Sequence, residues 1–399
     1  MNKFFSMMFA CLCIHTAVSC SPNKEVLQPE EPGNPSVPGT GGTDWSNVGI
    51  EYDDGTNIVF HVKIAIDKEG FDMRDMDFFK SKLKTQWDQI NERFNGLDKT
   101  NKLKRNYIFV PDLEDIILYN HNDNAQDPSS SHWEVPDHHN NRIDRSKFQC
   151  LVVYDFAVQA GEKGGGFGDS DGVGNILVIN PSESNIGKFY DHFAESANTV
   201  AAITHEMGHF RGVVDTYLCR VSAGNNPVSG QAFEPEAGNM NNPYPALPDC
   251  AWSDYEMRVI NANGAKKEFR MIYKTMRDYF PDEVEFNVTQ GGTKVENCKL
   301  NFYKIEGGKV KTPFVKTYDF TGGTLRKGGH ELFWYNDWVQ WPWTYYDIML
   351  VEAINTQTGA KGYSFLPAYE VHNKGIKDKV EDKISGKSIF SRTIDIKNP

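Results

Sequence analysis

Two hydrophobic periods alternate along the first half of the chain. Over residues 57–67 every second residue is apolar, which predicts a half-buried β-strand. Over residues 75–94 the apolar residues recur at intervals of three and four, which is the spacing of one buried helix face. Short apolar runs predict further strands at residues 107–110, 116–119, 150–154 and 176–179. A strand, a helix and more strands therefore precede a second helix, predicted from about residue 191 to residue 211.

This second helix carries the pattern His-Glu-x-x-His. Residues four apart on a helix lie on the same face one turn apart, so His205 and His209 can direct both imidazoles at one zinc ion. Glu206 stands beside them as a candidate general base. The composition of the chain gives this pattern by chance only roughly 0.02 times, which disfavours the alternative of a surface helix with two fortuitously spaced histidines.

A catalytic zinc also needs a third protein ligand and an open coordination position. Asp215, which follows His209 by six residues, is the candidate ligand. Gly212 explains how the chain reaches the metal, because a glycine adopts positive φ without strain and lets the helix stop and turn back. The alternative for Asp215 is a capping or surface carboxylate.

These residues resemble the motif of the metzincin metallopeptidases, His-Glu-x-x-His-x-x-Gly-x-x-His, which is followed by a methionine-containing turn. Asp215 stands where most metzincins have histidine, and here the chain is similar to the snapalysin-like members that use aspartate. The resemblance covers about residues 57–280. It implies an α+β catalytic domain with a twisted mixed sheet, helices behind the sheet and one edge strand along the active-site cleft.

The resemblance also assigns roles to residues beyond the motif. The segment 238–244, Gly-Asn-Met-Asn-Asn-Pro-Tyr, is similar to the methionine turn, and Met240 would form the floor beneath the zinc ligands. The alternative is a methionine that only fills the core. Tyr244 and Tyr217 are the two candidates for a hydroxyl group that stabilises the oxyanion.

Beyond this turn the pattern changes from helical to strand-like. A capping box at Ser253 begins a helix that is predicted to run to Phe280, where Pro281 ends it. Strands separated by glycine turns then predict an immunoglobulin-like β-sandwich, at residues 284–288, 299–303, 345–354 and 362–366. We expect a zinc peptidase domain over residues 47–283 and a sandwich domain over residues 284–399.

Three further segments each allow two interpretations. The glycine-rich segment 164–174 is either a loop at the rim of the cleft or a calcium site with Asp169, Asp171 and Asn175 as oxygen ligands. His132, His138 and His139 are either solvated loop residues or a second metal site. The aromatic residues of segment 333–346 either pack in the core and at a domain interface, or stack on sugar rings or a peptide.

The N-terminus predicts export from the cytoplasm. Residues 1–20 have a basic start and an apolar stretch, and they end in Ala-Val-Ser-Cys, which resembles a bacterial lipobox. Cys20 would carry a lipid anchor, which makes the protein a membrane lipoprotein of the periplasm or cell surface; secretion without lipidation is the alternative. Residues 21–46 are rich in proline and glycine and predict an extended tether.

Two of the four cysteines after this signal segment bracket the loop that follows Asp215. In an oxidising compartment, a disulfide between Cys219 and Cys250 would close this loop beneath the active site. The alternative is a set of buried thiols.

The charge balance narrows the class of partner. The chain of 399 residues has a formal net charge of −12, and no basic run interrupts the acidic balance. This disfavours nucleic acid and anionic membrane surfaces as partners, so we expect a monomer that acts on a peptide or protein substrate and contacts a membrane through its lipid anchor alone.

Together these features predict an extracytoplasmic zinc endopeptidase in which Glu206 is the general base for zinc-activated water. The alternative is a surface-anchored lipoprotein that binds a glycan or a protein and retains the peptidase domain as a degenerate scaffold. The presence of Glu206 favours the enzyme, because a degenerate site has no reason to keep its base.

Overall fold

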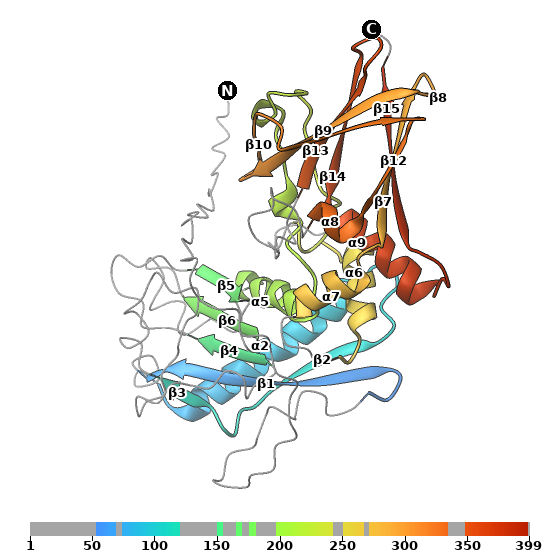
Figure 1. Ribbon diagram of the computed structural model, residues 1–399. Helices are drawn as coiled ribbons and strands as arrows, with labels where there is room; N and C mark the ends of the chain where they lie inside the picture. Colours follow the sequence, from blue (N-terminus) through green and yellow to red (C-terminus); the bar gives the residue numbers. More distant parts are fainter. Residues whose placement is uncertain are drawn as a thin grey trace, which may run out of the picture.

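The structure is a computed structural model of an α+β protein with several sheets and a few helices (Figure 1). It describes residues 53–68, 74–119, 150–154, 165–169, 175–180, 197–241, 250–266, 271–333 and 348–397. Outside these ranges lie the predicted signal segment with Cys20, the tether, Tyr244, most of the aromatic segment, and His132, His138 and His139. None of the helices in the described ranges combines the length and apolar content that a membrane crossing requires.

The N-terminal half is built on a sheet of mostly parallel strands. Its strand order is β2-β1-β4-β6-β5, and β3 pairs with the far end of β1. Every pair is parallel except that of β5 with β6, so β5 is an antiparallel strand at the edge. The strands are β1 (Asn57–Asp67), β2 (Asn106–Pro111), β3 (Ile117–Tyr119), β4 (Cys150–Tyr154), β5 (Gly165–Asp169) and β6 (Asn175–Asn180).

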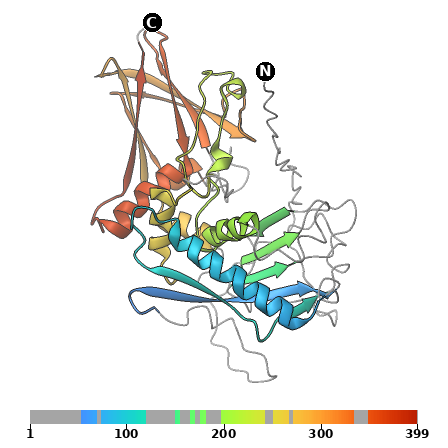
Figure 2. The same ribbon diagram turned by 180° about the vertical axis from the view of Figure 1, so that it is seen from behind.

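Two helices lie side by side across one face of this sheet (Figure 2). They are α2 (Met76–Gly96) and α5 (Ala197–Phe210), and the second carries the His-Glu-x-x-His pattern. Phe210, at the end of α5, packs edge-on against Phe60 of β1 with ring centroids 5.2 Å apart. The apolar stripe of each helix therefore faces the sheet, and α5 packs against the edge strand β5 and its neighbour β6.

The central strand β1 is more deeply buried than its alternating pattern predicts. Val59 and Ala65 lie on the face expected to be polar, yet both are buried. Lys63 on the same face is buried through ion pairs of 2.9 Å to Asp112 and 2.5 Å to Asp115. A strand with parallel neighbours on both sides is typically covered on both faces, and this overrides the half-buried pattern.

Part of the glycine-rich segment 164–174 forms a strand, where the loop interpretation expected none. Gly165–Asp169 forms β5 by antiparallel pairing with β6, in which Asp169 lies opposite Ile176. Glycine has a low strand propensity, so the local pattern gives no strand signal and the pairing partner decides the structure. The predicted oxygen ligand Asn175 begins β6, whereas Asp171 lies outside the described residues.

The helix predicted to run from Ser253 to Phe280 is two helices. α6 (Asp254–Asn263) begins with the predicted capping box and ends at Gly264, which adopts a positive φ of 48°. α7 (Met271–Tyr279) follows. A glycine in this conformation stops a helix, and the continuous apolar spacing conceals the stop.

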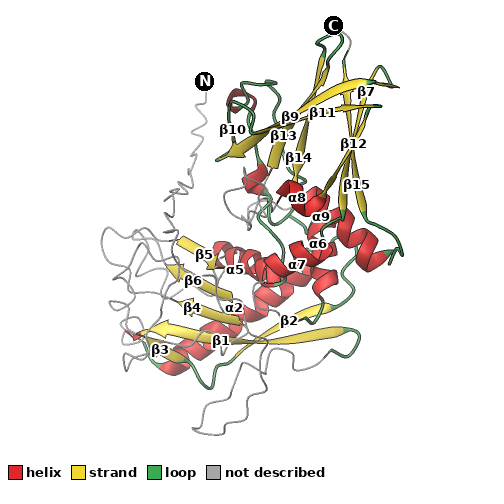
Figure 3. Ribbon diagram, viewed as in Figure 1, coloured by secondary structure: helices red, strands yellow, loops and turns green. Residues whose placement is uncertain are grey.

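The C-terminal half contains two further sheets (Figure 3). One has the order β10-β9-β13-β14 with β11 beside β9, and the other has the order β12-β7-β15 with β8 beside β7. Phe286 of β7 and Phe302 of β9 pack edge-to-face between the two sheets at 5.5 Å. The strands are β7 (Glu283–Gln290), β8 (Thr293–Lys294), β9 (Asn297–Glu306), β10 (Lys309–Val310), β11 (Lys316–Thr321), β12 (Thr324–Gly328), β13 (Ile348–Asn355), β14 (Lys361–Pro367) and β15 (Ile389–Ile396).

Four of these strands match the predicted ones, whereas β8, β10, β11, β12 and β15 have no counterpart in the sequence prediction. Strand β15 pairs with β7 in parallel, and all other pairs in the two sheets are antiparallel. A parallel neighbour requires a long connection, and helix α9 (Ala368–Ile376) lies within it.

Helix α9 packs between the C-terminal sheets and helices α6 and α7. His372 of α9 lies 3.1 Å from the hydroxyl of Tyr255 on α6 and 3.0 Å from the carbonyl oxygen of Thr275 on α7. Burial lowers the pKa of His372 to about 3, so the ring is neutral. The hydrophobic core continues from the first sheet through these helices into the C-terminal sheets. The chain on both sides of residue 283 therefore shares one core.

We predict that Gly375→Ala destabilises the protein by at least about 2 kcal/mol, because a Cβ there would overlap the carbonyl oxygen of Tyr279 and approach Pro281. Alanine at an unconstrained helix position would instead stabilise by about 0.5–1 kcal/mol. Gly386→Ala is the matched control, since its Cβ would meet no atom within 4 Å. Thermal unfolding of both variants measures the effect, and equal stability of the two would contradict the close packing of α9.

Candidate metal centre

The end of helix α5 directs the chain back toward its own histidines. Gly212 adopts a φ of 89°, its N–H bonds the carbonyl oxygen of His209, and Val213 N–H bonds that of Gly208. This pair of bonds is a Schellman motif, in which a left-handed glycine follows the last helical turn. The reversal carries Asp215 to the helix face that bears the histidines, as the position of Gly212 predicts.

Three side chains converge at this point. Asp215 Oδ1 lies 2.9 Å from His205 Nε2 and 3.2 Å from His209 Nε2. All three residues are buried, and the oxygen has no well-aligned hydrogen-bond donor although it is close to both rings. Two imidazole nitrogens and one carboxylate oxygen that face a common point are a ligand set suited to zinc.

The far side of each imidazole ring is held by a backbone carbonyl. His209 Nδ1 lies 2.7 Å from the carbonyl oxygen of Val213, and His205 Nδ1 lies 3.3 Å from that of Asn239. A carbonyl can only accept, so the proton of each neutral ring is assigned to Nδ1 and the lone pair to Nε2. Metal-binding histidines are typically oriented in this way by an acceptor behind the ring.

The electrostatics of the three groups also favour a cation. Burial would lower the pKa of His209, but the charge of Asp215 and contacts with Asp215, Glu206 and Val213 raise it to about 9. Burial would raise the pKa of Asp215, but the two histidines hold it below its usual range. Without a metal ion, a proton therefore takes the position between the rings and the carboxylate.

Glu206 lies close to the point where His205, His209 and Asp215 converge. Its Oε2 is 4.0 Å from His209 Nε2, which is longer than either contact of Asp215. Ligand atoms of His205, Glu206 and His209 all lie within 4.8 Å of one another, so the three could also hold a metal as a group. The Asp215 oxygen is closer to His209 Nε2, at 3.2 Å, than the Glu206 oxygen is.

Of the two candidate tyrosines, the structure describes Tyr217. It begins a short 3-10 helix two residues after Asp215, and its ring centroid lies 6.4 Å from that of His205. Its N–H bonds the carbonyl oxygen of Met240 at 3.4 Å. Tyr217 is thus held next to the first histidine.

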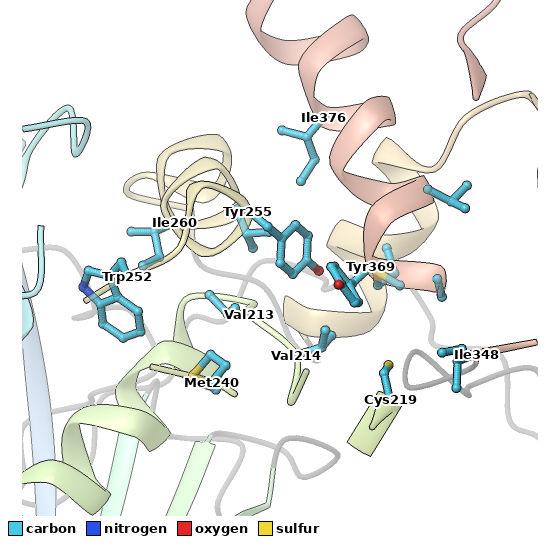
Figure 4. Close-up of a cluster of buried hydrophobic side chains, with 14 of the residues drawn as sticks. Val213, Val214, Cys219, Met240, Trp252, Tyr255, Ile260, Ile348, Tyr369 and Ile376 are labelled. Atoms are coloured by element: carbon cyan, nitrogen blue, oxygen red, sulfur yellow. The ribbon is translucent and has the colours of Figure 1, made fainter. Parts of the chain in front are cut away.

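Met240 lies against the backbone of helix α5, and it is fully buried (Figure 4). A Cβ at Gly208, between the two histidines, would come within 2.8 Å of Met240 Sδ and 3.3 Å of the Trp252 ring. Only a glycine lets the thioether approach the helix this closely. Met240 thus packs against the helix turn between His205 and His209, with Trp252 beside it.

Two supporting residues, Glu256 and Arg211, have no role that their local sequence predicts beyond the place of Glu256 in the capping box of Ser253. The carboxylate of Glu256 accepts backbone hydrogen bonds from the turn that contains Met240, and burial raises its pKa to about 7 against the opposing effect of those bonds. Arg211, which follows α5, is fully buried over the rings of Phe60 and Phe210. A helical pattern gives no signal for either, because both depend on contacts between distant segments.

The predicted disulfide between Cys219 and Cys250 is not formed in the structure. Cys219 is buried at the end of the hydrophobic cluster near Val214 and Ile348, and Trp252 lies at the other end in Figure 4. Cys250, two residues before Trp252, has its Sγ 3.5 Å from Asn239 Oδ1. The two cysteines flank one loop in sequence, but in the structure Cys219 lies near Val214 and Cys250 contacts Asn239.

A scan against protein-family models and a search of curated proteins find no match for this chain.

We predict that the chelator-treated protein loses stability as the pH rises from about 6.5 to about 9. A histidine whose folded pKa is raised stabilises the fold fully below its unfolded value of 6.5, and this stabilisation is lost as the pH passes the folded value of about 9. Asp215 stays ionised across this window. Thermal unfolding between pH 6 and pH 10 measures the slope. Asp215→Asn, the control, should flatten it, and an unchanged slope in this variant would contradict the coupling.

Proposed function

We propose that this protein is a zinc-dependent endopeptidase whose catalytic region is metzincin-like. The observation that carries the proposal is the convergence of His205 Nε2, His209 Nε2 and Asp215 Oδ1 at one buried point, after a helix reversal at Gly212. These three atoms would form the ligand set, and the Glu206 carboxylate, whose Oε2 is 4.0 Å from His209 Nε2, would lie beside it as the base.

The edge of the first sheet supports a peptide as the substrate. Strand β5 is the last strand of the sheet, it runs antiparallel to its neighbour, and helix α5 packs against it. An extended peptide can add to such an edge through backbone hydrogen bonds, which do not depend on its sequence. A peptide bound in this way would pass alongside the helix that carries His205 and His209.

The chemistry follows from the positions of the side chains. A zinc ion held by the two histidines and Asp215 would supply Lewis acidity, which lowers the pKa of bound water from about 15.7 toward about 7. Glu206 would accept the proton of the attacking water and deliver it to the departing amine. Tyr217, 6.4 Å from His205 between ring centroids, is the described candidate for a hydroxyl group near the oxyanion.

The C-terminal half is proposed to be an immunoglobulin-like β-sandwich, supported by the edge-to-face contact of Phe286 and Phe302 between its two sheets. We also propose that the protein is exported and anchored through Cys20, on the grounds of its N-terminal sequence. The competing function is a lipoprotein that binds a glycan or protein through this C-terminal region, with an inactive peptidase scaffold. Zinc content together with hydrolysis of an unfolded protein distinguishes the two functions.

We predict that Glu206→Gln retains zinc but lowers kcat by about 100-fold or more, which is the usual contribution of general acid–base catalysis. The measurement is hydrolysis of a peptide library by purified protein, with the products sequenced, alongside zinc analysis. A variant with near wild-type kcat would refute the mechanism, and loss of zinc would show that Glu206 binds the metal.

Asp215→Ala should lose most of its zinc on dialysis, because the two histidines alone leave the site one protein ligand short. The matched control is Asp254→Ala, since Asp254 is an exposed carboxylate at the start of α6 that forms an ion pair with the surface residue Lys102. Zinc is measured by atomic spectroscopy on the folded fraction. Full zinc occupancy in Asp215→Ala would contradict the assignment of the third ligand.

A further inference from the structure

Glu256 has surroundings unusual for a helix-capping carboxylate. It is 1% exposed, and its two oxygens accept three backbone N–H groups. Oε2 accepts from Ser253 at 2.7 Å and from Asn239 at 3.1 Å, and Oε1 accepts from Met240 at 2.7 Å. One bond is thus local to helix α6, and two come from a turn that precedes the helix by more than a dozen residues.

The capping box accounts for the bond to Ser253 alone. A capping glutamate or glutamine needs no burial, and either residue type can accept that single N–H. Burying a carboxylate is costly, and a buried charge is tolerated where its oxygens are satisfied. Three N–H donors on two oxygens require an acceptor at both oxygen positions, which a carboxylate supplies and an amide does not.

The turn that Glu256 holds is connected to the metal centre. It spans residues 238–241 and is closed by a bond from Asn241 N–H to the carbonyl oxygen of Gly238. The carbonyl oxygen of Asn239 lies behind His205, 3.3 Å from Nδ1, and that of Met240 accepts from Tyr217. Asn239 and Met240 thus each donate their N–H to Glu256 and use their carbonyl oxygen to contact a residue of the site, His205 and Tyr217 respectively.

We propose that Glu256 is a positioning residue for the metal centre. Its carboxylate fixes the turn at residues 238–241, and the turn fixes the ring orientation of His205 through the Asn239 carbonyl. This inference rests on the proposed zinc site, because its consequence is the affinity and geometry with which His205 binds a metal. Groups that orient a ligand from behind typically change metal affinity by about 10–100-fold when they are removed.

Gly238 gives independent support for a close fit between turn and carboxylate. A Cβ at this glycine would overlap the carboxylate of Glu256. The φ angle of Gly238 is not in the left-handed region, so its backbone does not demand glycine. The space required by the Glu256 carboxylate therefore explains the absence of a side chain at this position.

The experiment compares full-length Glu256→Gln with the wild-type protein. The variant leaves an amide N–H₂ facing at least one of the three N–H groups, so we expect zinc affinity to fall about 10-fold or more. The absorption bands of the cobalt(II)-substituted protein should also shift, because they report ligand geometry. Gly238→Ala displaces the same carboxylate without removing its charge, and it should change both readouts in the same direction.

Ser253→Ala is the matched control for helix stability. It removes the hydroxyl group that accepts from Glu256 N–H at 3.2 Å and leaves the carboxylate in place. We expect it to lower the Tm while zinc affinity and the cobalt spectrum stay unchanged. If Glu256→Gln behaves like Ser253→Ala, with a lower Tm and unaltered metal binding, the role of Glu256 is only structural and the inference is wrong.

Hydrogen exchange of the wild-type protein tests the same inference and does not depend on whether a variant folds. The N–H groups of Asn239 and Met240 should exchange with solvent deuterium as slowly as those in the centre of α5. Fast exchange would contradict the proposal that Glu256 fixes this turn. A wild-type protein that binds zinc but cleaves no peptide would refute the proposed function and leave the metal-binding test of Glu256 intact. A wild-type protein that binds no zinc refutes both.

Discussion

The buried carboxylate of Asp215 carries a negative charge that the surrounding residues must compensate. A negative charge in the interior is unfavourable unless a positive charge or several donors face it, and the two rings opposite it are each bound from behind by a carbonyl. The site is thus arranged to hold one positive charge between three groups. Two imidazoles and a carboxylate suit zinc better than calcium, which prefers oxygen ligands alone.

The sequence predicts the first layer of this site because that layer is local. His205, His209, Gly212 and Asp215 lie within eleven residues, so the helix period and one left-handed glycine determine how they meet. The secondary structure of the N-terminal half is predicted for the same reason, since each element has its own hydrophobic period. Strand β5 has no such signal, and only its pairing with β6 makes it a strand.

The layer behind the ligands depends on contacts between distant segments, and the sequence does not predict it. Helix α6 presents neighbouring residues to opposite sides: Glu256 faces the turn beneath the metal centre, and Tyr255 faces His372 of helix α9. The sequence prediction of a disulfide also depends on contacts between distant segments, and the structure contains no such disulfide. Cys219 and Cys250 flank one loop along the chain, yet in the structure Cys250 contacts Asn239 and forms no disulfide with Cys219.

The glycine contact between α9 and the end of α7 has a consequence for how this chain can be divided. Gly375 admits the carbonyl of Tyr279 so closely that the helix of one half fills space within the other. The C-terminal half is therefore not a freely exchangeable module. Fusing it to another protein would expose the apolar face of α9, and an N-terminal half without it would lose His372, the partner of Tyr255 on α6.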